Sequence, residues 1–390
     1  MLLLESCDVT VIGAGPAGVM AAWKAASSGA STILLERETD PGRKVCAEGV
    51  LGGVLSDAEI EPSSEFVANK ISGAVLYAPN EKKRVNVAGE GLILDKPSFL
   101  GVLAKRASSC GAAVRYGNLI EEIGRDDGHV ILKGRKSGET FTLRTKVVIG
   151  CDGVGSLLAR RFFARNKYVA IAALQYYMTD CTIEDETKLE IYVGHEKAPS
   201  GYIWVFPKGD GDANVGIGLK GGNARQLLDR FIAQHPKAFS KAKIGKTLAA
   251  PVPVGGEVAE FVIDNMMLCG DAAGQVIPLT GAGIHTSLVA GKVAGEVAGE
   301  SVQVGDASAS QLYRYVERFD RLFGERIENS LKALESFERF SDHDLNIITE
   351  LLEGQDLMDM ANGLKPNRAV GLLVRHPILA MKVAYQLLTS

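Results

Sequence analysis

A glycine-rich turn near the start of the chain constrains its fold more than any other feature. Residues 9–12 are β-branched and largely apolar, which predicts a buried strand, and Gly13-x-Gly15-x-x-Gly18 follows them directly. Glycines at this spacing permit a tight turn, close approach of a pyrophosphate to the backbone, and close packing of the next helix on the strand. Pro16 suits the first turn of that helix, where its missing N–H would have no partner in any case.

An acidic residue completes this motif. The helix is expected to run to about residue 28 and to end at Gly29, which accepts the left-handed backbone of a helix terminus. A second apolar strand, residues 32–35, leads into Glu36, eighteen residues after Gly18. A carboxylate at that place accepts hydrogen bonds from the ribose of an adenosine. The whole pattern predicts a dinucleotide-binding unit at the start of an α/β domain.

Two later stretches repeat the pattern of a buried strand that ends in a glycine turn with an acid. Residues 146–150 lead into Asp152, and residues 261–268 lead into Asp271. Ligands bind in the crevice at the carboxyl ends of such strands, so we expect all three turns to converge there. Residues 284–300 predict a helix whose N-terminus points its N–H groups and positive dipole end into the same crevice.

Length and composition set broad limits on the chain. Its 390 residues, 46% hydrophobic and 23% charged, fit a globular protein with two closely joined domains and appended segments. The net charge of −4 gives no electrostatic reason to expect a nucleic acid partner. Six cysteines are scattered without a CxxC pair, a pattern that favours reduced thiols over a disulfide framework or a metal site.

Targeting and membrane signals are weak throughout the sequence. The first residues include no basic segment and reach Glu5 at once, so we expect no signal peptide. No uninterrupted apolar run has the length of a membrane span. Residues 370–388 suit either a packing or dimer surface or a helix that contacts a membrane. We therefore expect a cytoplasmic protein, with peripheral contact to a membrane as the alternative.

A later stretch differs from the nucleotide-binding pattern. Tyr202, Trp204 and Phe206 alternate along one predicted strand and therefore share a face of it. Gly216 and Gly218 alternate along the returning strand and leave room beside these aromatic side chains. The aromatic stripe suits either the core of a second sheet or the wall of a channel for a substrate.

Two further motifs connect the chain with a known family. They are CAEG at residues 46–49 and GYIWVFPKG at residues 201–209. Together with the glycine turns, they resemble flavoproteins built like p-hydroxybenzoate hydroxylase. Among these, the sequence is similar to the geranylgeranyl reductases, above all the archaeal digeranylgeranylglycerophospholipid reductases. The resemblance covers about residues 7–300 and is loose beyond them.

This resemblance implies an α/β fold with three parts. They are a Rossmann-like FAD-binding domain, a substrate domain built on an antiparallel sheet, and C-terminal helices. We expect the FAD-binding domain at residues 1–72, 96–165 and 250–305, the substrate domain at 73–95 and 166–249, and the helical region at 306–390.

The resemblance also implies FAD as the cofactor. A negatively charged reduced flavin would be stabilised by the N-terminus of the helix at residues 284–300. His285 stands there in place of the small residue that the family suggests, and a positional or core role is favoured for it. Family members commonly carry an arginine where this chain has Lys96, which lacks the planar fork of arginine. The expected cofactor-binding residues are Gly13, Gly15, Ala17, Gly18, Glu36, Cys46, Ala47, Gly49, Lys96, Asp152, Asp271, Gly283 and Ile284.

The implied reaction saturates C=C bonds of geranylgeranyl chains in (di)geranylgeranylglyceryl phospholipids, in the synthesis of archaeal membrane lipids. Hydride from N5 of reduced FAD must be matched by a proton at the other alkene carbon, because no carbonyl polarises the bond. Cys46 is the candidate catalytic proton donor, and a small residue that packs beside the flavin is the alternative. Tyr202, Trp204 and Phe206 are the candidate substrate-binding residues. Electrons would come from NAD(P)H or reduced ferredoxin, since the sequence contains no second complete dinucleotide fingerprint.

Two other functions are compatible with the sequence. An FAD-dependent monooxygenase or halogenase of the same fold would process oxygen, and a prenyl-lipid carrier would bind its ligand without chemistry. The intact glycine turn, Glu36 and Asp271 argue against the carrier, which needs no cofactor. The motifs at residues 46–49 and 201–209 argue against the oxygen-dependent enzymes.

Overall fold

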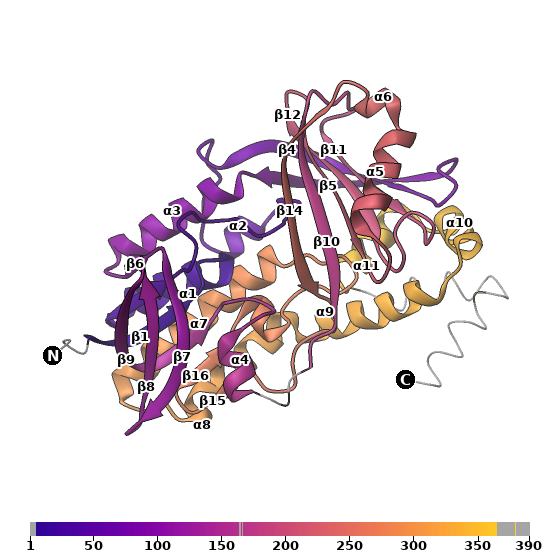
Figure 1. The fold of residues 1–390 in the computed structure, drawn as a ribbon. Helices are drawn as coiled ribbons and strands as arrows, with labels where there is room; N and C mark the ends of the chain where they lie inside the picture. Colours follow the sequence, from indigo (N-terminus) through magenta and orange to yellow (C-terminus); the bar gives the residue numbers. More distant parts are fainter. Residues whose placement is uncertain (1–4, 164, 166, 365–378, 380–390) are drawn as a thin grey trace.

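The computed structural model describes residues 5–163, 165, 167–364 and 379. Two sheets organise these residues, and they lie at the lower left and the upper right of Figure 1. Helices pack on both sheets and also connect them. The α/β fold expected from the sequence is therefore confirmed.

Parallel strands form the centre of the first sheet. Its order is β15 (Val262–Ile263), β16 (Met266–Leu268), β9 (Glu139–Gly150), β1 (Glu5–Ile12), β2 (Thr32–Leu35) and β6 (Ala113–Arg115), with the antiparallel strands β7 (Asn118–Asp126) and β8 (His129–Lys136) attached beside β9. β1 pairs in parallel with β2 and β9, and β9 pairs in parallel with β16. The carboxyl ends of these strands consequently lie at one edge of the sheet.

The helices that start at Pro16 and Ile284 begin where the sequence predicts. α1 (Pro16–Ser27) follows β1 directly, and a Cβ on Gly18 would lie only 1.8 Å from the carbonyl oxygen of Gly13. Only glycine therefore permits so close a turn from strand to helix. α3 (Lys96–Ser109) is capped by Asp95, whose carboxylate accepts a hydrogen bond of 3.0 Å from the backbone nitrogen of Ser98. α7 (Ile284–Val304) packs along α1 and is buried over most of its length.

One strand prediction was wrong. Residues 261–268 form two short antiparallel strands, β15 and β16, rather than a single strand. Asn265 lies between them with a left-handed backbone, φ +65°, and reverses the chain. β16 still runs parallel to β9, so Asp271 reaches the edge where we expect it.

The second sheet is antiparallel except where β11 pairs with β4. Its order is β14 (Lys243–Pro253), β10 (Ala170–Thr179), β13 (Asp212–Leu219), β12 (Tyr202–Gly209), β11 (Lys188–Val193), β4 (Val67–Tyr77), β5 (Arg84–Leu94) and β3 (Gly49–Leu51). α5 (Ala224–Gln234) and α6 (Pro236–Phe239) contribute Leu228, Phe231 and Phe239 to a core shared with Tyr176. The domain boundaries that we expect from the sequence remain predictions.

The described part of the chain between residues 309 and 361 is mostly helical, as the sequence predicts for this part of the chain. It contains α8 (Ala309–Leu312), α9 (Arg314–Arg339), α10 (Asp342–Leu351) and α11 (Gly354–Ala361). α9 packs on α7, and α11 packs on both α9 and β5, so these helices join the two sheets (Figure 1). The prediction for residues 370–388 lies outside the described residues apart from Leu379. Three shorter segments complete the fold: α2 (Val54–Asp57), α4 (Leu157–Phe162) and a 3-10 turn, η1 (Gly270–Ala273).

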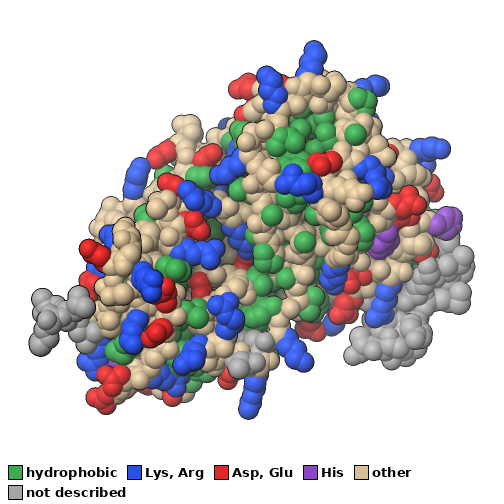
Figure 2. Space-filling view, in the orientation of Figure 1, with side chains coloured by type: hydrophobic (Ala, Val, Ile, Leu, Met, Phe, Trp, Pro, Cys, Tyr) green, Lys and Arg blue, Asp and Glu red, His purple; other side chains and the backbone are tan. Residues whose placement is uncertain are grey.

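Charged side chains of both signs are interspersed over the face shown in Figure 2, with hydrophobic side chains between them. Within the described part of the chain, no helix combines the length and the apolar character needed to cross a bilayer.

Candidate active site

The three glycine turns meet, as the sequence predicts. Ile12 and Leu268 flank Gly150 in adjacent parallel strands, so the turns after β1, β9 and β16 start side by side. A Cβ on Gly13 would lie 2.5 Å from the carbonyl oxygen of Cys151. The three turns therefore start together at the carboxyl edge of the first sheet.

The first turn has the features of a dinucleotide site. A Cβ on Gly15 would meet no atom within 4 Å, so the backbone at the start of α1 is open to an approaching phosphate. The Glu36 carboxylate accepts hydrogen bonds from the backbone nitrogens of Ala14, at 2.7 Å, and Glu38, at 2.9 Å. These contacts hold the acid beside the glycine turn. The open backbone and the fixed carboxylate fit the adenosine and pyrophosphate end of FAD.

Asp152 has a contact that supports the fold, in addition to the contact with the cofactor that we expect from the sequence. One carboxylate oxygen accepts a hydrogen bond of 2.8 Å from the backbone nitrogen of Leu157, at the start of α4. The other oxygen is buried and has no hydrogen-bond partner among the described residues. Burial raises the pKa of this carboxyl group. Its proposed contact with the cofactor therefore stays a prediction.

A large, mostly apolar cavity of about 860 Å³ lies next to the third of these turns, since Asp271 lines it. Of the predicted site residues, it is lined by Cys46, Ala47, Gly49, Lys96, Tyr202, Trp204, Phe206, Asp271, Gly283 and Ile284. Gly13, Gly15, Ala17, Gly18, Glu36 and Asp152 do not line it. The structure thus separates the predicted residues into a group at the dinucleotide turn and a group around the cavity.

The C-terminal helices supply a wall of this cavity that the sequence did not reveal. Leu334 and Phe337 of α9, Ile348 of α10, and Leu357 and Met358 of α11 all line it. The apolar periodicity of residues 314–339 predicts a helix with one buried face. That signal does not distinguish packing against a core from lining a cavity.

Cys46 faces the cavity from the loop before β3. Its sulfur accepts a hydrogen bond of 3.3 Å from the backbone nitrogen of Glu48. Burial raises the pKa of the Cys46 thiol, an effect that the nearby Lys96 ammonium opposes. The thiol therefore keeps its proton at neutral pH. Lys96 is itself buried and donates a hydrogen bond of 3.0 Å to the carbonyl oxygen of Lys44.

Asp271 and the start of α7 form the part of the cavity nearest the glycine turns. The Asp271 carboxylate forms an ion pair with Lys44. His285 forms a hydrogen bond of 2.8 Å with Asp57 and packs edge-on against Phe323, with ring centroids 5.0 Å apart. Burial lowers the pKa of His285. These contacts agree with the positional role that we expect for this histidine.

The aromatic stripe lines the cavity from β12. The Trp204 ring covers Gly216, because a Cβ there would lie 2.2 Å from the indole, and Phe206 packs against Gly49 in the same way at 2.9 Å. The room that the strand glycines leave is therefore occupied by the indole itself rather than left for a ligand. Tyr202 donates a hydrogen bond to the carbonyl oxygen of Thr280, and burial raises its pKa to about 12.

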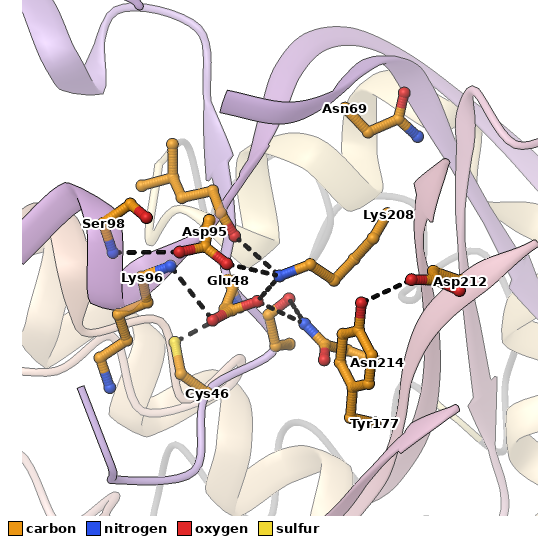
Figure 3. Close-up of polar contacts among 12 residues, drawn as sticks. Cys46, Glu48, Asn69, Asp95, Lys96, Ser98, Tyr177, Lys208, Asp212 and Asn214 are labelled. Carbon is orange, nitrogen blue, oxygen red and sulfur yellow. Dashed lines mark hydrogen bonds and ion pairs between the residues drawn. The ribbon is translucent and has the colours of Figure 1, made fainter. Parts of the chain in front are cut away.

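Polar side chains behind the Cys46 loop form a cluster that sequence reasoning missed (Figure 3). Lys208 pairs with the carboxylate of Glu48, and Asn214 donates a hydrogen bond of 2.8 Å to the same carboxylate. Glu48 belongs to the motif at residues 46–49, and Lys208 belongs to the motif at residues 201–209. Their places in these two motifs were the signal in the sequence that could have pointed to the cluster.

Comparison with known proteins identifies the family. Residues 8–162 match the FAD dependent oxidoreductase family, and residues 170–252 match the geranylgeranyl reductase catalytic domain. Digeranylgeranylglycerophospholipid reductase 2 of Methanopyrus kandleri is 37% identical over 369 residues, which cover 91% of this chain and 93% of that protein. The chain belongs to the digeranylgeranylglycerophospholipid reductase family. The family resemblance inferred from the motifs is thus confirmed.

Solved structures agree with membership in this reductase family. A geranylgeranyl bacteriochlorophyll reductase-like protein from Thermoplasma acidophilum has a TM-score of 0.85 and 29% identity, with 98% of this chain and 100% of that chain covered. A flavin-dependent brominase has a TM-score of 0.75 at 14% identity, covering 95% and 99% of the two chains, and shares the fold alone. The predicted FAD-dependent flavoprotein fold is confirmed by these likenesses and by the family match at residues 8–162.

Proposed function

We propose that this chain saturates C=C bonds in the geranylgeranyl chains of (di)geranylgeranylglyceryl phospholipids, with FAD as its cofactor. The observation that carries the proposal is the apolar cavity that begins at Asp271 and Cys46 and continues between the second sheet and the C-terminal helices. An isoprenoid chain is apolar along its length, so most of its affinity must come from buried area. A cavity with a mostly apolar lining suits such a chain. The same cavity also extends to residues assigned to the cofactor.

Different residues of the chain would hold different parts of FAD. Glu36 and the turn at Gly15 would hold the adenosine and pyrophosphate, while Asp271 and the N-terminus of α7 at Gly283 would hold the flavin end. When bound and reduced, FAD supplies the hydride that the alkene needs. The positive end of the α7 dipole favours negative charge at this place.

Cys46 is the candidate proton donor of the chain. Its thiol lines the cavity and keeps its proton because burial raises its pKa. A general acid must hold a proton at working pH and lie within reach of the acceptor. Tyr202 also lines the cavity, but its hydroxyl proton is engaged with the carbonyl oxygen of Thr280. Cys46 is therefore a better candidate for the proton donor than Tyr202.

The aromatic wall positions the chain and excludes water. Tyr202 and Trp204 pack edge-on with ring centroids 5.9 Å apart, and Trp204 is fixed by its hydrogen bond of 3.2 Å to Gln175. Rigid aromatic side chains at this wall would hold the alkene in a fixed register. Such placement matters because a reacting bond must sit in near-attack geometry.

Electron supply and membrane contact complete the proposal. The electron donor is NAD(P)H or a reduced ferredoxin that docks transiently, since the sequence carries one dinucleotide fingerprint, at Gly13. Because the proposed substrate resides in a bilayer, the protein would work in the cytoplasm and meet the membrane surface peripherally.

The decisive experiment is turnover with a defined lipid. Protein reconstituted with FAD is reduced with dithionite and incubated with digeranylgeranylglyceryl phosphate, and the extracted lipids are analysed by mass spectrometry. We expect masses that increase by two hydrogens for each saturated bond. If no chain is saturated and a separate aerobic assay with NAD(P)H in place of dithionite shows oxygen consumption that depends on the protein, the monooxygenase or halogenase alternative is supported. Tight lipid binding without any product would support the carrier.

A further inference from the structure

A buried ion pair joins the two distinctive motifs of the chain. Lys208, from the second motif, pairs with the carboxylate of Glu48, from the first, and their side chains are 8% and 12% exposed. The ammonium of Lys208 also donates a hydrogen bond of 3.3 Å to the carbonyl oxygen of Leu94 and lies 3.9 Å from the carboxylate of Asp95 (Figure 3). Lys208 thus connects β12 with the loop before β3 and with the end of β5.

Glu48 adopts a backbone conformation that needs such support. Its φ is +68°, in the left-handed region that residues with a side chain rarely occupy. Strained conformations of this kind persist only where the surroundings hold them in place. The holding contacts are the pair with Lys208, the hydrogen bond of 2.8 Å from Asn214, and one of 3.3 Å from the backbone nitrogen of Lys96.

The conformation of Glu48 determines where the Cys46 sulfur lies. The backbone nitrogen of Glu48 donates its hydrogen bond to that sulfur at 3.3 Å. Removal of the Lys208 ammonium would leave a buried carboxylate without its cation, which is unfavourable enough to drive the loop to rearrange. Any such rearrangement changes the place and the exposure of the thiol.

We propose that Lys208 is a positioning residue: through Glu48 it holds residues 46–48 in the conformation that presents the Cys46 thiol to the cavity. This inference rests on the proposed role of Cys46 in the reduction. Lys208 does not line the cavity and touches neither substrate nor cofactor residues directly, so its effect on the reaction runs through the loop.

The first test is a double-mutant cycle with the FAD-reconstituted protein. Lys208→Met keeps a long apolar stem and removes the charge, and we expect single-turnover lipid reduction to slow by about 10- to 100-fold, as a misplaced reacting group does. In a Cys46→Ala background, Lys208→Met should cause no further loss, because both changes act on one group. Lys197→Met is the matched control: Lys197 also forms a half-buried pair, with Glu81, but does not line the cavity or contact the loop at residues 46–48, and its loss should leave the rate unchanged.

The second test measures the exposure of the Cys46 thiol and requires no catalytic turnover. N-ethylmaleimide labelling of Cys46, followed by mass spectrometry of the peptide, should become several-fold faster in Lys208→Met but not in Lys197→Met. If the unsubstituted protein reduces no prenyl chain, the proposed function fails and the labelling rate still decides the positioning role. Equal slowing by Lys208→Met with and without Cys46, or unchanged labelling and an unchanged rate, would overturn the inference. Should Lys208→Met not fold, Lys208→Gln, which retains a hydrogen-bond donor, takes its place with the same expected directions.

Discussion

The side-chain nitrogen of Asn214 lies 2.8 Å from the carboxylate of Glu48 and donates a hydrogen bond to it. The same nitrogen donates to the carbonyl oxygen of Ala47 at 3.2 Å, and the side-chain oxygen of Asn214 accepts a hydrogen bond of 3.0 Å from Gln175. Gln175 in turn accepts the indole N–H of Trp204 at 3.2 Å. The thiol-bearing loop and the aromatic wall of the cavity are therefore parts of one buried polar network, and a change at one end is felt at the other.

Replacement of Cys46 tests the proton-donor role. Cys46→Ala should slow lipid reduction by about 10²- to 10⁴-fold, the usual contribution of a general acid, while FAD remains bound. Because burial raises the pKa of the thiol, the wild-type rate should stay flat across neutral pH and fall only once the pH passes the ordinary cysteine value of 9.0. Single-turnover rates measured from pH 6 to 10 check both points. Cys46→Ser controls for side-chain size, and an alanine variant as fast as wild type would reduce Cys46 to a packing residue.

Truncation of Trp204 tests the channel wall. The indole is only 6% exposed, so Trp204→Ala should destabilise the fold by about 3–5 kcal/mol. If the residue also holds the prenyl chain, substrate affinity falls several-fold and partly saturated products accumulate, as judged by lipid mass spectrometry beside a thermal melt. Phe231→Ala is the control, since Phe231 is buried in the core of the same sheet and does not line the cavity. A destabilised Trp204 variant with normal products would exclude the channel role.

The adenosine end of the cofactor site depends on Glu36. Glu36→Leu should weaken FAD binding by about 10- to 100-fold, because hydrogen bonds to a charged group contribute about 1.5–3 kcal/mol each. The loss is measured by fluorescence titration of the apoprotein with FAD. Glu38→Gln is the control, because the Glu38 side chain is half-buried and, among the described residues, forms ion pairs with neighbouring arginines. A Glu36 variant that binds FAD like wild type would show that the ribose is held elsewhere.

Glu257 gives the fold a pH-dependent weakness. Burial, helped by the nearby Asp320 carboxylate, raises the pKa of Glu257 from 4.5 to about 7. Since the folded state holds this proton more tightly than the unfolded state, the associated stability is complete below pH 4.5 and is lost as the pH rises through about 7. Glu257→Gln should therefore stabilise the protein at pH 8 by about 1–3 kcal/mol and have little effect near pH 5. Urea unfolding at both pH values measures the difference, and equal effects at the two would contradict the raised pKa.

Local patterns were sufficient to predict the dinucleotide unit. The strand, the glycine turn and Glu36 all lie within residues 9–36, where each element depends on its near neighbours in the sequence. The start of α3 was predictable for the same reason, because Asp95 caps it through a residue three positions later. The convergence of the three turns followed from the rule that parallel strands share one carboxyl edge.

Contacts between distant residues were not predictable from one sequence. Glu48 and Lys208 are 160 residues apart, and each is an unremarkable charged residue until the fold buries both. The sequence of α9 shows only the periodicity of an amphipathic helix. This periodicity does not indicate whether the apolar face packs on a core or lines a cavity. The break at Asp264-Asn265 was a polar turn signal inside an otherwise apolar stretch, and a short hairpin there resembles one continuous strand.

The position of the cavity wall in the chain has a consequence for biosynthesis. Both sheets are complete by Leu268, whereas the helices that close the cavity begin at Arg314, so the wall emerges from the ribosome after both sheets. A nascent chain that has already emerged with its dinucleotide turn and aromatic strand still presents an open apolar groove. Lipid capture by a half-made protein would thus be weak, and a chain cut short before α9 would lose the cavity wall together with Phe319 and Phe323, which α9 packs into the core of the first sheet.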